Sequence, residues 1–100
     1  MDRSEVITLI REAHSKNAYG MDTRTETRQD VFANIKSVSR QEFFEAGQAG
    51  IQPQYVFTMF APDYGGEKIV EYSGKRYAVY RTYARRDDNI ELYVEERAGV

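Results

Sequence analysis

Histidine and the acidic residues are the side chains of this sequence that could hold a metal ion or move a proton. His14 is the only histidine, and the chain has no cysteine. A metal site at His14 would need carboxylates alone as its other ligands, so we expect an ordinary polar residue near a strand end. Asp87 and Asp88 lie close to Glu91, but the spacing lacks the glycine and regular oxygen ligands of a calcium loop. We expect solvated acids in a turn, and predict no catalytic residue, no metal and no cofactor.

A second group of residues could bind phosphates. Gly65 and Gly66 are adjacent, but no Lys-Ser or Lys-Thr pair follows them. A phosphate-binding loop needs that pair and a strand-to-helix crossover around it. We therefore interpret these glycines as a turn.

The segment from residue 76 to residue 86 combines tyrosines with arginines, as a stacking platform for single-stranded nucleic acid does. The residues concerned are Tyr77, Tyr80, Tyr83, Arg76, Arg81, Arg85 and Arg86. Strict strand alternation places Tyr77 and Tyr83 on one face, with Val79 and Arg81, and Tyr80 on the other. The aromatic rings are then divided between core and surface, which favours packing in the protein's own core over a binding platform.

Composition narrows the fold and the function. The chain has 100 residues and a net charge of -2, without the basic excess that binding to duplex nucleic acid requires. It has 8 valines, 6 isoleucines, 6 threonines and 13 aromatic residues but only 2 leucines, which is typical of strands and argues against a helical bundle. No apolar run approaches the roughly 18 residues of a membrane helix, and the first residues lack a signal-peptide pattern. We expect synthesis in the cytosol and no association with a membrane.

Alternation of apolar and polar residues predicts six strands in a single domain over residues 1–100. The expected strands cover residues 6–10, with an exit into a turn at residues 14–17, then residues 25–38, 55–60, 68–72, 75–83 and 90–96. In the second strand the inward-facing half should begin near Val31. Ser73-Gly74 joins two of these strands as a tight hairpin, because glycine supplies the positive φ of such turns. We predict a mainly β fold, a small antiparallel β-barrel.

One segment, inserted after the second strand, fits a plain barrel poorly. Ser39 and Glu42 form a capping-box pattern in which each side chain reaches the other residue's backbone amide. The pattern starts a short helix over residues 40–49, but Gly47 and Gly50 weaken it, so a flexible loop is equally compatible. Phe43 and Phe44 point about 100° apart on a helix. Either both bury against different parts of the barrel, or the segment is a movable element that contacts another subunit.

The order of these motifs resembles a known family. The pattern S-x-x-E-[FY]-[FY]-x-A runs from Ser39 to Ala46, a glycine turn follows, then the hairpin Tyr72-Ser73-Gly74-Lys75-Arg76-Tyr77 and a terminal strand. It is similar to the head-closure proteins of long-tailed bacteriophages and prophages, also called head-tail joining or stopper proteins. The resemblance covers residues 31–97, about two-thirds of the chain.

The resemblance implies a structural, non-enzymatic virion component of the phage neck, made in the bacterial host cytoplasm. Family members form a ring of copies, dodecameric in the virion, below the portal and adaptor proteins. The ring closes the DNA channel after packaging and presents the surface that the tail terminator or tail completion protein contacts, so packaged DNA is only cargo. The implied channel plug and oligomer contact consists of Ser37, Val38, Ser39, Arg40, Gln41, Glu42, Phe43, Phe44, Glu45, Ala46, Gly47, Gln48, Ala49 and Gly50.

Two alternatives remain open from the sequence. The chain could be another neck protein, an adaptor or a tail terminator, which also forms rings but meets different partners. It could instead be a small barrel that binds single-stranded nucleic acid through its tyrosines and arginines.

Overall fold

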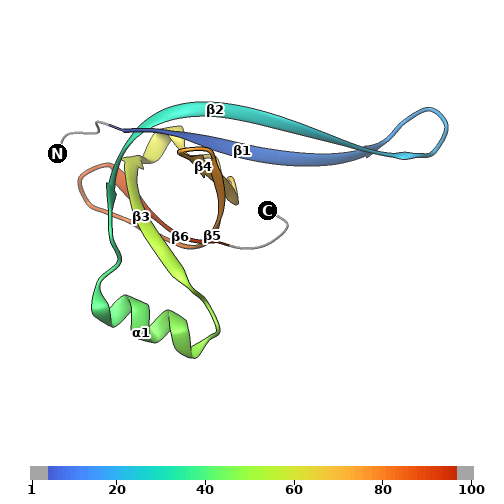
Figure 1. Cartoon of the computed structure of the whole chain (residues 1–100). Coiled ribbons are helices and arrows are strands. Elements are labelled where there is room, and N and C mark those ends of the chain that lie inside the picture. The colour runs from blue at the N-terminus through green and yellow to red at the C-terminus, as the bar shows by residue number, and fades with distance from the viewer. Residues whose placement is uncertain (1–4, 97–100) are drawn as a thin grey trace.

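Six antiparallel strands close into a ring in the computed structural model, which describes residues 5–96 (Figure 1). The strands are β1 (Glu5–Lys16), β2 (Asp22–Lys36), β3 (Pro53–Phe60), β4 (Ile69–Tyr72), β5 (Lys75–Ala84) and β6 (Asn89–Glu95). Their order around the ring is β1-β2-β3-β6-β5-β4, and β4 pairs with β1 to close it. A helix, α1 (Arg40–Gln48), follows β2, and a short 3-10 helix, η1 (Ala61–Asp63), follows β3. The predicted mainly β, barrel-like fold with one inserted helix is confirmed.

The hydrophobic core fills the inside of the ring and draws on every strand. Its buried members are Ile7, Leu9, Val31, Ala33, Phe57, Met59, Val70, Tyr77, Leu92 and Val94. The ring of Phe57 packs against those of Tyr55, Tyr72 and Tyr77, with centroids 5.7–6.4 Å apart. As predicted, burial in β2 begins at Val31, whereas the preceding residues of that strand are largely exposed. The period of two is therefore the pattern that places the core.

The predicted tight hairpin between β4 and β5 is confirmed. Ser73 has φ 54° and Gly74 has φ 81°, so both turn residues lie in the left-handed region. Two such residues in succession give a turn whose twist matches that of the flanking strands. This hairpin completes the ring beside β1.

The predicted end of the first strand is wrong. Residues 14–16 do not turn but continue β1, and β2 begins at Asp22 and ends at Lys36 instead of covering residues 25–38. The two strands pair without interruption from Glu5 opposite Ala33 to Lys16 opposite Asp22. The reversal occurs at Asn17, whose side-chain oxygen accepts hydrogen bonds from the backbone amides of Tyr19 and Met21.

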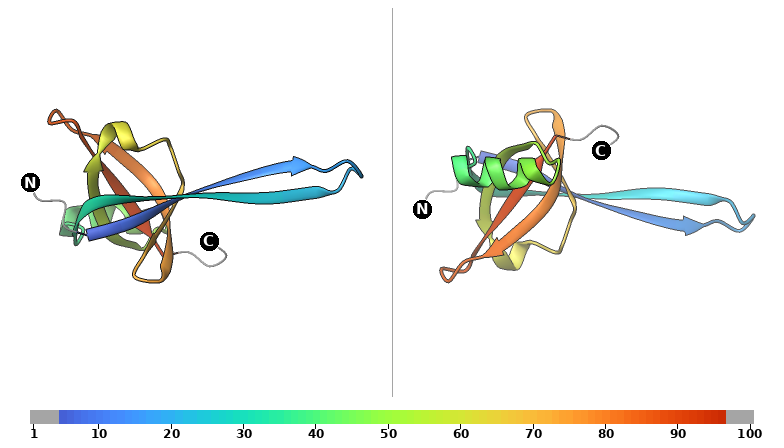
Figure 2. Two further views of the ribbon diagram at one scale, coloured as in Figure 1. Left: turned by 90° about the horizontal axis from the view of Figure 1, so that it is seen from above. Right: turned by 90° about the horizontal axis from the view of Figure 1, so that it is seen from below.

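The far part of this hairpin projects from the ring as a two-stranded arm, residues 11–28 (Figures 1 and 2). Pairing between β1 and β4 covers only residues 8–10, and pairing between β2 and β3 covers only residues 33–36. The arm is a strand pair because Thr23, Thr25 and Thr27 favour extended backbone. Its strand residues are almost all polar or charged, so it stays outside the core.

No helix among residues 5–96 is long and apolar enough to span a membrane.

Candidate functional site

Two of the three acidic residues considered for chemistry, Glu91 and Asp87, are paired with cations or a hydroxyl group. The Glu91 carboxylate accepts a hydrogen bond from the Tyr93 hydroxyl at 2.7 Å and lies 3.6 Å from both Lys36 and Arg85. Asp87 forms an ion pair with Arg85 at 3.0 Å. His14 lies opposite Arg24 on the arm, away from these acids. Across residues 5–96, the His, Asp and Glu side chains form no group of three or more that could hold a metal ion.

The two adjacent glycines lie in the connection between η1 and β4. The amide of Gly65 donates to the Glu67 carboxylate at 2.6 Å, and the hydroxyl of Tyr64 donates to the Glu67 carbonyl at 2.6 Å. Arg11 of β1 donates to the carbonyl of Gly65. The connection is thus held by its own chain against the base of the arm.

The tyrosine-arginine segment divides differently from the expectation, because β5 carries a bulge. The pairing register with β6 shifts between Val79 and Arg81, so Tyr80 and Arg81 together oppose Tyr93. The extra residue reverses the alternation beyond it. Tyr77, before the bulge, lies in the core, whereas Arg81 and Tyr83, beyond it, face outward, and the predicted grouping of these three on one face is wrong. The predicted division of the tyrosines between core and surface is confirmed.

The sequence is compatible with either a short helix or a flexible loop in the inserted segment, and the structure has the helix. The Ser39 hydroxyl oxygen accepts from the Glu42 amide at 3.1 Å, so this half of the predicted capping box is present. The helix ends at Gln48, one residue earlier than expected; Gly50 has φ 79°, and the amide of Ile51 donates to the carbonyl of Ala46. A left-handed glycine with this bond pattern is a common helix C-terminus.

The carboxylate of Glu42 does not complete the capping box, because it is bound by β5. The Arg81 guanidinium donates to both carboxylate oxygens, and the hydroxyl of Tyr80 donates to one of them at 2.7 Å. The same guanidinium lies 3.7 Å from the centre of the Tyr93 ring. This Glu42 contact ties the first turn of α1 to the outer wall of the ring. It depends on the bulge, which brings two consecutive residues of β5 to one carboxylate.

The electrostatics of the Glu42 contact agree with its geometry. The hydrogen bond from Arg81 lowers the pKa of the Glu42 carboxyl below its ordinary value, so the glutamate is ionised at neutral pH. Burial, followed by the hydrogen bond to Glu42, raises the pKa of the Tyr80 hydroxyl, which therefore keeps its proton. A groove of about 560 Å³ runs between α1 and the wall; Glu42, Arg81 and Tyr93 line it together with Lys36 and Val56.

The apolar side chains of α1 do not bury in the ring. Phe43 is 57% exposed and Phe44 is 67% exposed, and Ala46 is the only buried residue of α1. The interpretation in which both phenylalanines bury against the barrel is therefore wrong. Together with Gly47 and Gln48 they line a shallow depression of about 260 Å³.

The structure assigns each residue of the predicted plug a place. Ser37 and Val38 lie in an irregular segment before the helix, and Ser39 is its N-cap. The next nine residues are α1, and Ala49 and Gly50 follow its C-terminal end. Sequence reasoning missed two features, the arm and the role of Arg81. In β2, threonines alternate with charged residues, and this pattern could have indicated an exposed arm. No local sequence pattern predicts the bulge that presents Arg81.

No protein-family model matches this chain, and the search of curated proteins found no significant match.

Proposed function

We propose that this chain is a non-enzymatic structural protein of a bacteriophage neck. In this proposal, copies of it form a ring below the portal and adaptor proteins, and the ring closes the DNA channel and receives the tail. The proposal rests on the sequence resemblance to head-closure proteins. The structural observation that supports it best is the exposure of Phe43 and Phe44 on a helix that its own ring does not cover.

The exposed pair fits a contact between copies. Burying a phenylalanine side chain fully stabilises an assembly by roughly 1.5–3 kcal/mol relative to leaving it in water. Two adjacent phenylalanines on each of several copies would therefore supply a substantial driving force for packing the helices against one another. We assign residues 37–50 as the channel plug on this basis.

A plug must also open, and α1 has few bonds that would prevent movement. A helix of nine residues is marginal by itself in water. Besides its cap, α1 is held to the ring chiefly by the Glu42 contact with Arg81 and Tyr80 and by burial of Ala46. The irregular residues 37–39 on one side and Gly50 on the other can serve as hinges.

Of the two glutamates in α1, only one adds uncompensated negative charge to the proposed plug. Glu42 is neutralised by Arg81, whereas Glu45 accepts a hydrogen bond from Gln41 and has no cation bonded to it among the residues that the structure describes. With a net charge of -2 for the chain, the protein has little electrostatic attraction for DNA phosphate. Such weak attraction is what a channel component needs if DNA is to pass through it.

The experiment replaces both phenylalanines in the phage or prophage that encodes the chain. Phe43→Ser with Phe44→Ser is expected to leave the fold intact but to yield heads that lose their DNA or lack tails. Val6→Ser is the matched control, because Val6 is 49% exposed and lies on β1, away from α1. Full retention of DNA and normal tail attachment in the double variant would contradict the plug, and normal virions from a gene deletion would overturn the proposed function.

The single-stranded nucleic-acid alternative receives less support from the site. Of its three tyrosines, Tyr77 is buried and Tyr80 is bonded to Glu42, which leaves Tyr83 as the exposed one. Titration with a single-stranded oligonucleotide at two salt concentrations separates the alternatives. Tight binding that weakens strongly with salt would favour the alternative over the neck protein.

Co-purification with a portal-adaptor complex or with tail proteins separates the head-closure position from an adaptor or tail terminator.

A further inference from the structure

The arm carries a strand edge that no other strand of residues 5–96 covers. β2 pairs with β1 over residues 22–33 on one side, but on the other side it pairs with β3 only over residues 33–36. The backbone amides and carbonyls of residues 22–32 that point away from β1 thus face solvent. A two-stranded hairpin is marginally stable by itself in water, and an open edge is a template for a further strand.

The side chains along this edge alternate in charge. Asp22, Arg24, Glu26, Arg28 and Asp30 project in turn on one face of β2. The opposite face carries Thr23, Thr25 and Thr27, which are uncharged and favour strands. An extended partner with the same alternation, shifted by one step, would meet opposite charges along the whole edge.

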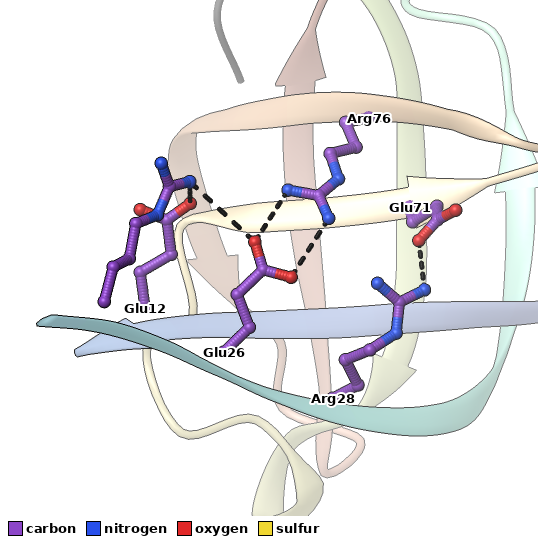
Figure 3. Close-up of polar contacts among 6 residues, drawn as sticks. Glu12, Glu26, Arg28, Glu71 and Arg76 are labelled. Atoms are coloured by element: carbon purple, nitrogen blue, oxygen red, sulfur yellow. Dashed lines mark hydrogen bonds and ion pairs between the residues drawn. The ribbon is translucent and has the colours of Figure 1, made fainter.

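The base of the arm is already held in a fixed direction by its own chain. The Arg76 guanidinium of β5 donates to both oxygens of Glu26 at 3.0 and 3.1 Å, and Arg28 forms an ion pair with Glu71 of β4 (Figure 3). These pairs lie on the side where β4 and β5 approach β1. The free edge of β2 is the other side of the arm, so a partner strand need not displace them.

We propose that the free edge of β2 pairs with the same edge of a second copy of this chain. An antiparallel alignment centred on Thr25 places Asp22 opposite Arg28 of the second copy and Arg24 opposite its Glu26. The two-fold symmetry repeats both pairs in the other direction. Thr25 then meets Thr25 of the second copy. Opposite charges directly across strands stabilise pairing, and like charges destabilise it.

The charge pattern and the ring together select this alignment. Moving the second copy by two residues in either direction places like charges opposite one another, such as Asp22 against Glu26 or against Asp30. Moving it by four residues toward the ring pushes its arm tip past residue 32, where β3 already occupies the edge, and moving it by four residues away from the ring leaves only residues 22–24 of β2 in contact. The alignment on Thr25 keeps the whole contact within residues 22–32.

The apolar residues of the arm tip support the same alignment. Tyr19 is 88% exposed and Met21 is 65% exposed. In the proposed pair the tip of one arm lies beside the base of the other, where Phe32 is 63% exposed. Both apolar groups gain a partner in the dimer.

This contact goes beyond the proposed function. A two-fold contact uses the same surface on both copies and closes after two of them, whereas a ring needs two different surfaces on each copy. The arm pair is therefore a state of the chain outside the neck ring. It neither requires the plug nor follows from it.

Charge reversal provides the test, with sedimentation equilibrium as the readout. The wild-type chain is expected to dimerise, and the single variants Arg24→Glu and Glu26→Lys are each expected to dimerise at least about tenfold more weakly, because each places like charges opposite one another twice. An equimolar mixture of the two variants restores both opposite-charge pairs and is expected to dimerise like wild type. Lys75→Glu, in the β4–β5 hairpin, is the control and should behave as wild type.

The mixture separates strand pairing from simple loosening of the arm, since Glu26→Lys also breaks the pair with Arg76. Circular dichroism of each variant checks that the ring is folded. A wild-type chain that stays monomeric at all accessible concentrations, variants that dimerise as wild type, or a mixture that stays monomeric would each overturn the proposal. None of these results bears on DNA retention by the Phe43 and Phe44 variant, so the two proposals fail independently.

Discussion

Glu42 and Arg81 lie 39 positions apart in the chain and form the ion pair that attaches α1 to the outside of the ring. The same carboxylate would otherwise be available to the cap of its own helix. Its use by β5 means that the position of α1 depends on tertiary structure as well as on helix propensity.

Glu42→Gln is expected to loosen α1 at neutral pH, because the amide keeps its shape but loses the charge-assisted bonds to Arg81. We expect hydrogen exchange of residues 40–49 to become about fivefold faster, corresponding to about 1 kcal/mol for a partly exposed pair. Glu45→Gln, whose carboxylate has Gln41 as its hydrogen-bond partner, is the control. Equal exchange in both variants would show that the Glu42 contact does not hold the helix.

The Glu42 contact also predicts a pH dependence. The hydrogen bond from Arg81 lowers the pKa of Glu42 from its ordinary value of 4.5, so the folded state binds the proton more weakly than the unfolded chain. The stabilisation is therefore complete above the ordinary pKa and is lost as the pH falls through the lowered pKa. Exchange of α1 in the wild type and in Glu42→Gln should converge in acid. A difference that persists at the lowest pH at which the ring stays folded would contradict the assignment.

Arg76→Gln is expected to free the base of the arm without unfolding the ring. Arg76 bonds Glu26 on the protein surface, and that exposed pair is screened by salt. Amide exchange in residues 22–28 should therefore speed up in the variant, and high salt should have the same effect on the wild type. Measurements in dilute solution, with Lys75→Gln as the control, give the effect of the single chain. No change in the arm would show that backbone pairing alone orients it.

Phe57→Ala is expected to destabilise the ring by roughly 3–5 kcal/mol, because it leaves a cavity among Tyr55, Tyr72 and Tyr77. Phe57 is 0% exposed. Phe32→Ala removes a ring of the same size at a position that is 63% exposed, and should change the free energy of unfolding by less than about 0.5 kcal/mol in dilute solution. Urea denaturation measures the free energy of unfolding of both variants. Similar losses of stability in the two would show that Phe57 does not belong to the core.

Ser73→Asn is expected to stabilise the hairpin between β4 and β5. Ser73 has φ 54°, and asparagine tolerates left-handed backbone better than serine does. We expect a gain of up to about 0.5 kcal/mol, and a loss of about 1 kcal/mol for Gly74→Ala at φ 81°. Thermal unfolding compares the two, and a loss from Ser73→Asn would contradict the turn geometry.

Much of the fold follows from local patterns in the sequence. The alternation from Val31 to Ile35 places the inward face of β2, and Ser39 starts α1 through a hydrogen bond within one turn. Ser73-Gly74 fixes the turn before β5. These features depend on residues that are neighbours in the chain, so their chemistry is readable from spacing alone.

The tertiary structure decided the rest, because the contacts concerned join residues far apart in sequence. The bulge at Tyr80 and Arg81 arises where β5 pairs with β6, and it reverses an alternation that the sequence continues without a break. The arm extends past Ile10 because cross-strand pairing with β2 sustains an exposed strand that has no core to cover. Residue types determined that Phe43 and Phe44 are apolar neighbours on a short helix. Only the packing of α1, held by Glu42 against β5, left both of them in water and thus available to another molecule.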